Sequence, residues 1–187
     1  MNIDRDDIVH LTEEYGGPWG LNHTRRLLHL ISLISDEQTY DADVVWLSAH
    51  LHDWGAYAPW AQDGVDHALR SKQVAETFLV ARDLPEEFKA RVLECIEFHH
   101  SGNPDRSIES ILLSDADALD FLGVVGVLRD FAKNPKDMKK AFESTKKRRK
   151  TIPQQLLLQE SRELAVRRIE EMDALLSTFE EETHGYF

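Results

Sequence analysis

Residues 41–55 read DADVVWLSAHLHDWG, and this stretch decides much of the fold. Its apolar residues recur at helical spacing and predict a helix from about Asp41 to Asp53, with Gly55 as its stop. The centre of the helix, Val44-Val45-Trp46-Leu47, is apolar on all sides. We therefore expect this helix, Trp46 included, to be buried in the core. The helix ends on His52-Asp53, two side chains of the types that bind metal ions.

Other imidazole and carboxylate side chains lie on both sides of this pair. In chain order they are His23 upstream, then His67, His99-His100 and Asp115-Ala116-Asp117 downstream. These ligand types suit a borderline or hard divalent cation. The chain has a single cysteine, Cys95, which excludes a cage of thiolates. The order predicts a metal-dependent hydrolase site that several helices assemble.

The rest of the chain also predicts helices, and no segment alternates as a strand would. Apolar periodicity predicts helices over about 3–15, after Asn22 as N-cap, and over 66–82, 85–99, 107–119, 122–132 and 154–182. Breaks fall at Gly16-Gly17-Pro18, 56–65, 101–104 and Asn134-Pro135. The sequence therefore predicts an all-α fold, a compact helical bundle with a long C-terminal helix. Residues 1–135 would form the metal-binding core, and residues 136–187 a helical extension that packs on it within a single domain.

Composition and charge limit the partners. Hydrophobic residues make up 42% of the chain and charged residues 30%, which argues against disorder. The net charge of -12 repels nucleic acids and anionic membranes, so we expect neither as a partner. It would also repel a phosphorylated substrate unless a metal or local basic residues reverse the sign at the site. We interpret the basic run 146–150 as a solvated helix end.

The expected location is cytoplasmic. The first ten residues, MNIDRDDIVH, lack the basic and then apolar character of a secretory signal, and no stretch is apolar for long enough to span a membrane. Cys95 lies among apolar residues of a predicted helix, which favours a buried, reduced thiol. The long tail helix leaves room for a homodimer.

Most of the candidate ligands fall at predicted helix ends. Two neighbouring residues in mid-helix point about 100° apart and rarely bind one ion, but a helix terminus relaxes this limit. His52 and Asp53 can therefore both serve. His50 should point to the opposite side of its helix, and we expect His10, His29 and His184 to be structural or solvated. Asp115 and Asp120 suit capping, or orienting a ligating imidazole.

The ordered set resembles the HD superfamily of metal-dependent phosphohydrolases, in particular a bacterial subgroup of small HD-domain hydrolases. The resemblance rests on NHTRRLL at 22–28, LSAHLHDWG at 47–55, DHALRSKQVAETFL at 66–79, IEFHH at 96–100 and LSDADALDFLGVVGVLR at 113–129. It covers most of the chain. It implies that the compact bundle is an HD domain.

The resemblance also implies roles for single residues. The family's metal ligands fall on His23, His52, Asp53 and Asp117, with Asp115 as the competing choice for the last one. His67 and His99 fall where two-metal members place ligands of a second metal and one-metal members place residues that contact phosphate, and His100 is a further candidate. One or two divalent ions are expected per chain, from among Mn, Mg, Co, Ni, Zn and Fe.

The implied activity is hydrolysis of a small phosphorylated metabolite, most plausibly a nucleotide, by phosphomonoester, pyrophosphate or phosphodiester cleavage. Asp53 would orient or deprotonate the attacking water, and His67, His99 or His100 would stabilise the phosphoryl group or protonate the leaving oxygen. Lys72 and Arg26 could each present a cation to the substrate, and Trp54 and Trp60 could line the pocket. Two alternatives stay open: a di-iron oxygenase with the same ligand order, and a non-enzymatic metal-binding regulatory module.

Overall fold

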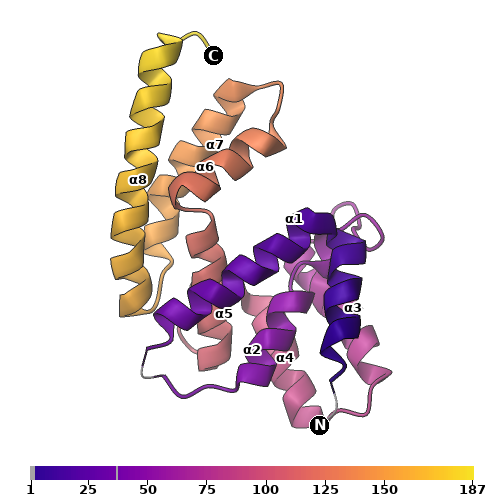
Figure 1. The fold of residues 1–187 in the computed structure, drawn as a ribbon. Helices are drawn as coiled ribbons and strands as arrows, with labels where there is room; N and C mark the ends of the chain where they lie inside the picture. Colours follow the sequence, from indigo (N-terminus) through magenta and orange to yellow (C-terminus); the bar gives the residue numbers. More distant parts are fainter. Residues whose placement is uncertain (1–2, 37) are drawn as a thin grey trace.

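The structure, a computed structural model, describes residues 3–36 and 38–187, and this part of the chain is helical with no strand. The helices are α1 (Arg5–Ile34), α2 (Ala42–Leu51), α3 (His67–Val80), α4 (Glu86–Phe98), α5 (Ile108–Asp120), α6 (Gly123–Lys133), α7 (Met138–Thr151) and α8 (Gln159–Thr183). Two short 3-10 turns, η1 (Trp54–Ala56) and η2 (Ile152–Gln154), join them. The predicted all-α fold with a long C-terminal helix is confirmed. In Figure 1, α6, α7 and α8 lie together on one side of the molecule, beside the body that α1 to α5 form.

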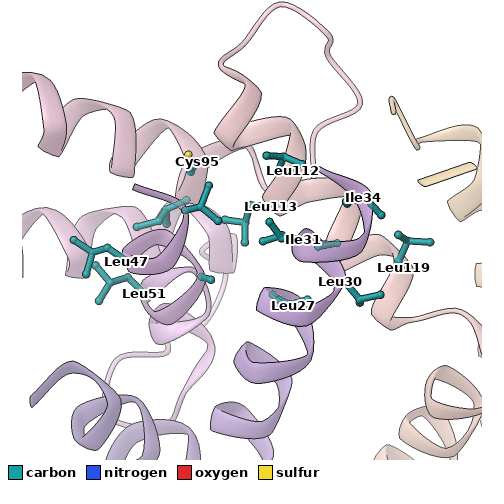
Figure 2. Close-up of a cluster of buried hydrophobic side chains, with 14 of the residues drawn as sticks. Leu27, Leu30, Ile31, Ile34, Leu47, Leu51, Cys95, Leu112, Leu113 and Leu119 are labelled. Carbon is teal, nitrogen blue, oxygen red and sulfur yellow. The ribbon is translucent and has the colours of Figure 1, made fainter. Parts of the chain in front are cut away.

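The core lies where α1, α2, α4 and α5 meet. Figure 2 shows α1 side chains facing those of α2 and α5; the labelled residues are Leu27, Leu30, Ile31, Ile34, Leu47, Leu51, Cys95, Leu112, Leu113 and Leu119, all buried. Each such aliphatic side chain contributes about 1.5–3 kcal/mol by leaving water. Helix α2 is central, as its apolar sequence predicts, and Asp41 caps it by accepting hydrogen bonds from the N–H groups of Asp43 and Val44.

Trp46 departs from this prediction. It is half-buried, and its ring lies 4.0 Å from the ring of His50, with the guanidinium of Arg5 at 4.6 Å on it. The expectation that Trp46 belongs to the interior of the core was wrong. The reason is that α2 has one face turned towards the N-terminal turn of α1, where an indole packs against a cation.

Helix α1 is kinked at Gly17, whose φ of 62° lies in the left-handed region. Glycine takes this conformation without steric cost, and Pro18 then fits the first turn of the continuing helix. The helix thus restarts at Pro18, and Asn22 lies inside it, so the predicted N-cap at Asn22 was wrong. The kink places Gly16 and Gly20 against the ring of Tyr57; an added Cβ on Gly16 would lie 2.6 Å from that ring.

The C-terminal helices pack on each other through aromatic rings. Phe131 of α6 and Phe142 of α7 both contact Phe179 of α8, at ring separations of 5.1 and 5.7 Å. Arg168 of α8 donates a hydrogen bond of 2.8 Å to the carbonyl of Leu119 at the end of α5. These contacts hold α6 and α7 beside α5. Across residues 3–36 and 38–187, none of the helices combines the length and apolar character needed to cross a bilayer.

Gly55 fixes the approach of η1 to α3. Its N–H donates a 2.9 Å hydrogen bond to the hydroxyl of Ser71, and a Cβ on Gly55 would overlap the backbone of Arg70 and Ser71. We predict that Gly55→Ala lowers the free energy of unfolding by about 1–3 kcal/mol, the cost of overpacking. Gly102→Ala is the control, because a Cβ there meets nothing within 4 Å, and it should change stability by less than about 0.5 kcal/mol. Equal chemical-denaturation midpoints for the two variants would contradict this.

Candidate metal centre

Four side chains from three separate parts of the chain converge beside the end of α2. His23 comes from α1, His52 is the C-cap of α2, Asp53 follows it, and Asp117 lies inside α5. The Nε2 of His23 lies 3.2 Å from Oδ1 of Asp117 and 3.8 Å from Oδ2 of Asp53. The Nε2 of His52 lies 3.5 Å from the same Asp53 oxygen. Two imidazole nitrogens and two carboxylates therefore face one small volume.

The histidine ring orientations fit a divalent ion. The Nδ1–H of His52 donates a 2.8 Å hydrogen bond to the carbonyl of Ala49, which leaves Nε2 as the nitrogen with the lone pair. That Nε2 is buried and has no hydrogen-bond partner in the described part of the chain. A buried nitrogen without a partner is costly, by about 1–3 kcal/mol. A divalent cation would remove that cost, and the two imidazoles and two carboxylates are donors that such a cation accepts.

Asp120 orients His23. Its Oδ2 accepts a 2.8 Å hydrogen bond from Nδ1–H of His23, and Arg26 donates to both of its oxygens at 2.7 and 2.9 Å. Arg129 donates to it as well. The carboxylate is buried, so its charge needs these partners. This hydrogen bond turns Nε2 of His23 towards Asp53 and Asp117, the arrangement expected when a second carboxylate aligns a metal-binding imidazole.

Asp115 and Asp117 have different partners in the structure. Asp115 accepts hydrogen bonds from the N–H groups of Leu157, at 3.1 Å, and Leu158, at 2.9 Å, and so ties α5 to the segment that precedes α8. Asp117, two residues on, faces His23. Geometry thus favours Asp117 over Asp115 as the fourth candidate ligand, because both oxygens of Asp115 accept backbone N–H groups elsewhere.

A second group of imidazoles adjoins the first. The ligand atoms of His67, His99 and His100 lie within 4.8 Å of one another. The Nε2 atoms of His67 and His100 are 2.7 Å apart, while the buried Nε2 of His99 has no hydrogen-bond partner in the described part of the chain. Asp53 and Asp117 stand between the two groups, since Oδ1 of Asp53 lies 3.9 Å from His67 and Oδ2 of Asp117 lies 3.3 Å from His100.

Burial and charge set the protonation states of this cluster. Burial lowers the pKa of His23, but its hydrogen bonds to Asp117 and Asp120 outweigh burial and raise the pKa to about 9. Burial, together with neighbouring His52 and His100, lowers the pKa of His99 to about 3, so His99 is neutral. Burial raises the pKa of Asp117, but the hydrogen bond with His23 overrides it and holds that pKa below its ordinary value. The carboxylate is therefore ionised.

A cavity of about 840 Å³ opens onto both groups. Its walls include Trp19 and Gly20 of α1, Tyr57 after η1, and three cations of α6 and α7 that sequence reasoning missed: Arg129, Lys133 and Arg148. Burial, followed by the charge of Asp53, raises the pKa of Tyr57 well above its ordinary value, so its hydroxyl stays protonated. The sequence did contain one indication of a cationic surface here, because Arg129 and Lys133 are four residues apart and therefore share a helix face. Arg148 belongs to the run that we interpreted as a solvated helix end, and this interpretation was wrong for it.

Four of the residues suggested for substrate binding or catalysis do not line this cavity. Trp54 is buried in the core, where its Nε1–H donates to the hydroxyl of Thr12 at 3.3 Å. Trp60 packs edge-on against Tyr15, at a ring separation of 5.7 Å. The expectation that these two indoles line the pocket was wrong, because both rings pack against Tyr15 of α1, and Trp54 also packs against Phe78 of α3.

The two suggested cations are engaged elsewhere. Lys72 pairs with Glu97 of α4 at 2.6 Å, and Arg26 is held by Asp120. Neither lies among the residues that line the cavity. Lys72 follows His67 by five residues on α3, but this spacing does not bring its ammonium into the cavity. The prediction that Lys72 contacts the substrate was therefore wrong.

Comparison with known proteins matches residues 20–122 to the HD domain family. The chain belongs to the HD-domain family. This segment begins before His23 and ends after Asp117 and Asp120, so it contains both imidazole groups. The resemblance inferred from the sequence is confirmed. Among solved structures, this chain is similar to YpgQ of Bacillus subtilis, which was crystallised in complex with ADP. The two sequences are 22% identical, and the TM-score is 0.72 over 95% of this chain and 93% of that one.

Two further solved structures share the fold. A predicted HD superfamily hydrolase from an uncultured Thermotogales bacterium is 23% identical, with a TM-score of 0.69 over 95% of this chain and 92% of that one. An HD-superfamily hydrolase from Bacillus thuringiensis is 18% identical, with a TM-score of 0.72 over 96% of each chain. In each case the likeness extends well beyond residue 122, so the C-terminal helices belong to the shared fold.

Asp120 and Asp115 lie on the same helix and allow a matched test. We predict that Asp120→Asn lowers the affinity for a divalent ion roughly 10–100-fold, because His23 loses its charged acceptor. Asp115→Asn should lower the free energy of unfolding while leaving metal affinity unchanged, since Asp115 contacts α8. Titration calorimetry with Mn²⁺ and denaturant unfolding of both variants would test the pair. Equal metal affinities in the two variants would contradict the assignment.

The raised pKa of His23 predicts that metal uptake releases a proton. Metal-free protein below about pH 9 carries this proton, and His23 must lose it before Nε2 can bind a cation. Mn²⁺ affinity should therefore rise about tenfold per pH unit between pH 7 and 8 and level off above pH 9. Calorimetry in buffers of different ionisation enthalpy measures the proton count. Uptake at pH 7 without proton release would contradict this.

Proposed function

We propose that this HD-domain chain is a divalent-metal-dependent phosphohydrolase that acts on a small phosphorylated metabolite of the nucleotide class. The observation that carries the proposal is the pair of buried, unpartnered Nε2 atoms of His52 and His99. His52 lies beside Asp53, and Asp53 and His99 line a cavity with cations on its walls. Imidazoles beside carboxylates suit the metal, and cations suit a phosphate group. His23, His52, Asp53 and Asp117 are the residues that would hold the ion.

A divalent ion bound here would lower the pKa of a water molecule and offset negative charge that develops on phosphorus. The side chains supply the rest. Burial raises the pKa of Asp53, but the neighbouring imidazoles of His52 and His23 outweigh burial and hold that pKa below its ordinary value, so Asp53 is ionised. It can therefore orient the water or accept its proton. His67 and His100 are partly exposed at the cavity and can donate to a phosphoryl oxygen or to the leaving oxygen.

Three observations favour a nucleotide. The cavity of about 840 Å³ falls in the size range of small-molecule sites. Trp19, Tyr57 and Phe121 give it aromatic walls against which a base can pack. The structural relative YpgQ was crystallised with ADP. Cleavage of a phosphomonoester, of a pyrophosphate linkage and of a phosphodiester are all compatible with the floor of the cavity, and a nucleotide panel separates them.

The second imidazole group supports an alternative activity. Asp53 and Asp117 each place one carboxylate oxygen near His23 and the other near the His67/His99/His100 group. Two metals could therefore be held by six side chains: His23, His52, Asp53, His67, His99 and Asp117. A di-iron oxygenase would use such a set. It would contain two irons per chain and require dioxygen, whereas a phosphohydrolase would release phosphate or pyrophosphate under nitrogen. Absence of both activities would instead favour the third alternative, a non-enzymatic metal-binding regulatory module.

We predict that His52→Ala and Asp53→Asn reduce metal-dependent phosphate or pyrophosphate release from nucleotides by at least about 100-fold, because the ion and the water lose their ligand and base. His29→Ala is the control. His29 is an exposed histidine on α1, the same helix as His23, and its loss should leave turnover unchanged. Circular dichroism would verify that the variants keep their helices. Full Mn²⁺-dependent turnover by folded His52→Ala protein would refute the proposal.

A further inference from the structure

Three cations surround one aromatic ring on the cavity wall. The guanidinium carbons of Arg148 and Arg129 lie 4.0 and 4.2 Å from the ring centre of Phe121, and the ammonium of Lys133 lies 5.4 Å from it. All four side chains line the cavity. They come from the end of α5 and from α6 and α7, and not from the helices that carry His23 and His52. This part of the cavity thus has its own chemistry.

Nearby carboxylates balance the three cations only in part. Arg129 shares Asp120 with Arg26 and His23, and Arg148 approaches Asp130 at 3.4 Å. Lys133 forms no ion pair with any carboxylate of residues 3–36 and 38–187. Like charges held together cost free energy unless an anion joins them. In a chain of net charge -12, a local positive excess inside the cavity also attracts an anion that the rest of the surface repels.

We propose that Lys133 and Arg148 form an anion subsite that binds a second phosphate group of the substrate, separate from the group that is cleaved at the His/Asp cluster. The subsite rests on the proposed function for the position of the cleaved group. It predicts that preferred substrates carry two or more phosphate groups. Lys133 acts as a mobile point charge, whereas Arg148 packs over Phe121 and offers a planar set of N–H donors.

The side chains suit this role better than a structural one. Arg129 is buried and tied to Asp120, so it stabilises the His23 orientation and helps to set the charge of the wall. Lys133, in contrast, is exposed to the cavity, and its ammonium group donates no hydrogen bond to another residue of the described chain. Its removal should therefore change ligand binding more than stability. This distinction makes Lys133 the residue to substitute.

The experiment compares two ligands that cannot be hydrolysed. Methylenediphosphonate has two phosphorus groups and methylphosphonate has one, and calorimetry would measure both on Mn²⁺-loaded protein. We expect Lys133→Met to weaken methylenediphosphonate binding roughly tenfold and methylphosphonate binding less than about twofold, because only the larger ligand reaches the subsite. Lys136→Met is the matched control: Lys136 is exposed, lies outside the cavity, and its loss should leave both affinities unchanged.

The possible results are distinct. Unchanged methylenediphosphonate affinity in Lys133→Met would overturn the subsite, and so would an equal loss for both ligands, because Lys133 would then contact the group at the metal. Either result, together with normal nucleotide turnover by the unmodified protein, would leave the proposed hydrolase function intact. If the unmodified protein bound neither ligand and hydrolysed no nucleotide, the subsite and the proposed function would both fail.

Discussion

The hydrogen bond between His23 and Asp120 is the constraint on which the candidate metal centre depends. It joins α1 to α5 across the interior and sets which nitrogen of His23 faces the cavity. Asp120 is buried, and it keeps its charge because Arg26 and Arg129 approach it from two other directions. A buried carboxylate with fewer partners would be unstable in its ionised form. The helical core of leucine and isoleucine side chains holds α1 and α5 close enough for this bond to form.

The cavity beside His23 has two chemically different parts, a floor and a wall. The floor contains imidazoles and the carboxylates of Asp53 and Asp117, gathered at the end of α2 and inside α5. The wall that α6 and α7 contribute carries cations around Phe121. In a chain of net charge -12, the opposite signs of floor and wall allow one cavity to favour a divalent cation at one place and phosphate groups at another. The C-terminal helices therefore shape the site and do not merely cover the core.

Much of the fold and of the floor could be predicted from the sequence. Helical periodicity indicated the elements, and His52-Asp53 at the end of an apolar helix indicated where ligands gather. Local patterns could not indicate partners distant in the sequence. Lys72 has a partner in Glu97, and Trp54 has one in Thr12, so neither reaches the cavity. Asn22 resembled a cap, but Gly17 and Pro18 restart the helix earlier because backbone conformation at glycine outweighs side-chain capping. The wall of α6 and α7 was missed because it requires knowing that Arg148 folds back onto Phe121.

A crystal structure of the protein grown with Mn²⁺, with anomalous data collected near the manganese absorption edge, would show whether the side chains of the candidate metal centre bind an ion. We expect an anomalous peak bounded by the Nε2 atoms of His23 and His52 and by the carboxylates of Asp53 and Asp117. A second peak at His67, His99 and His100 would extend the centre to two ions. Crystals grown with Mn²⁺ that showed no peak among His23, His52, Asp53 and Asp117 would contradict this assignment.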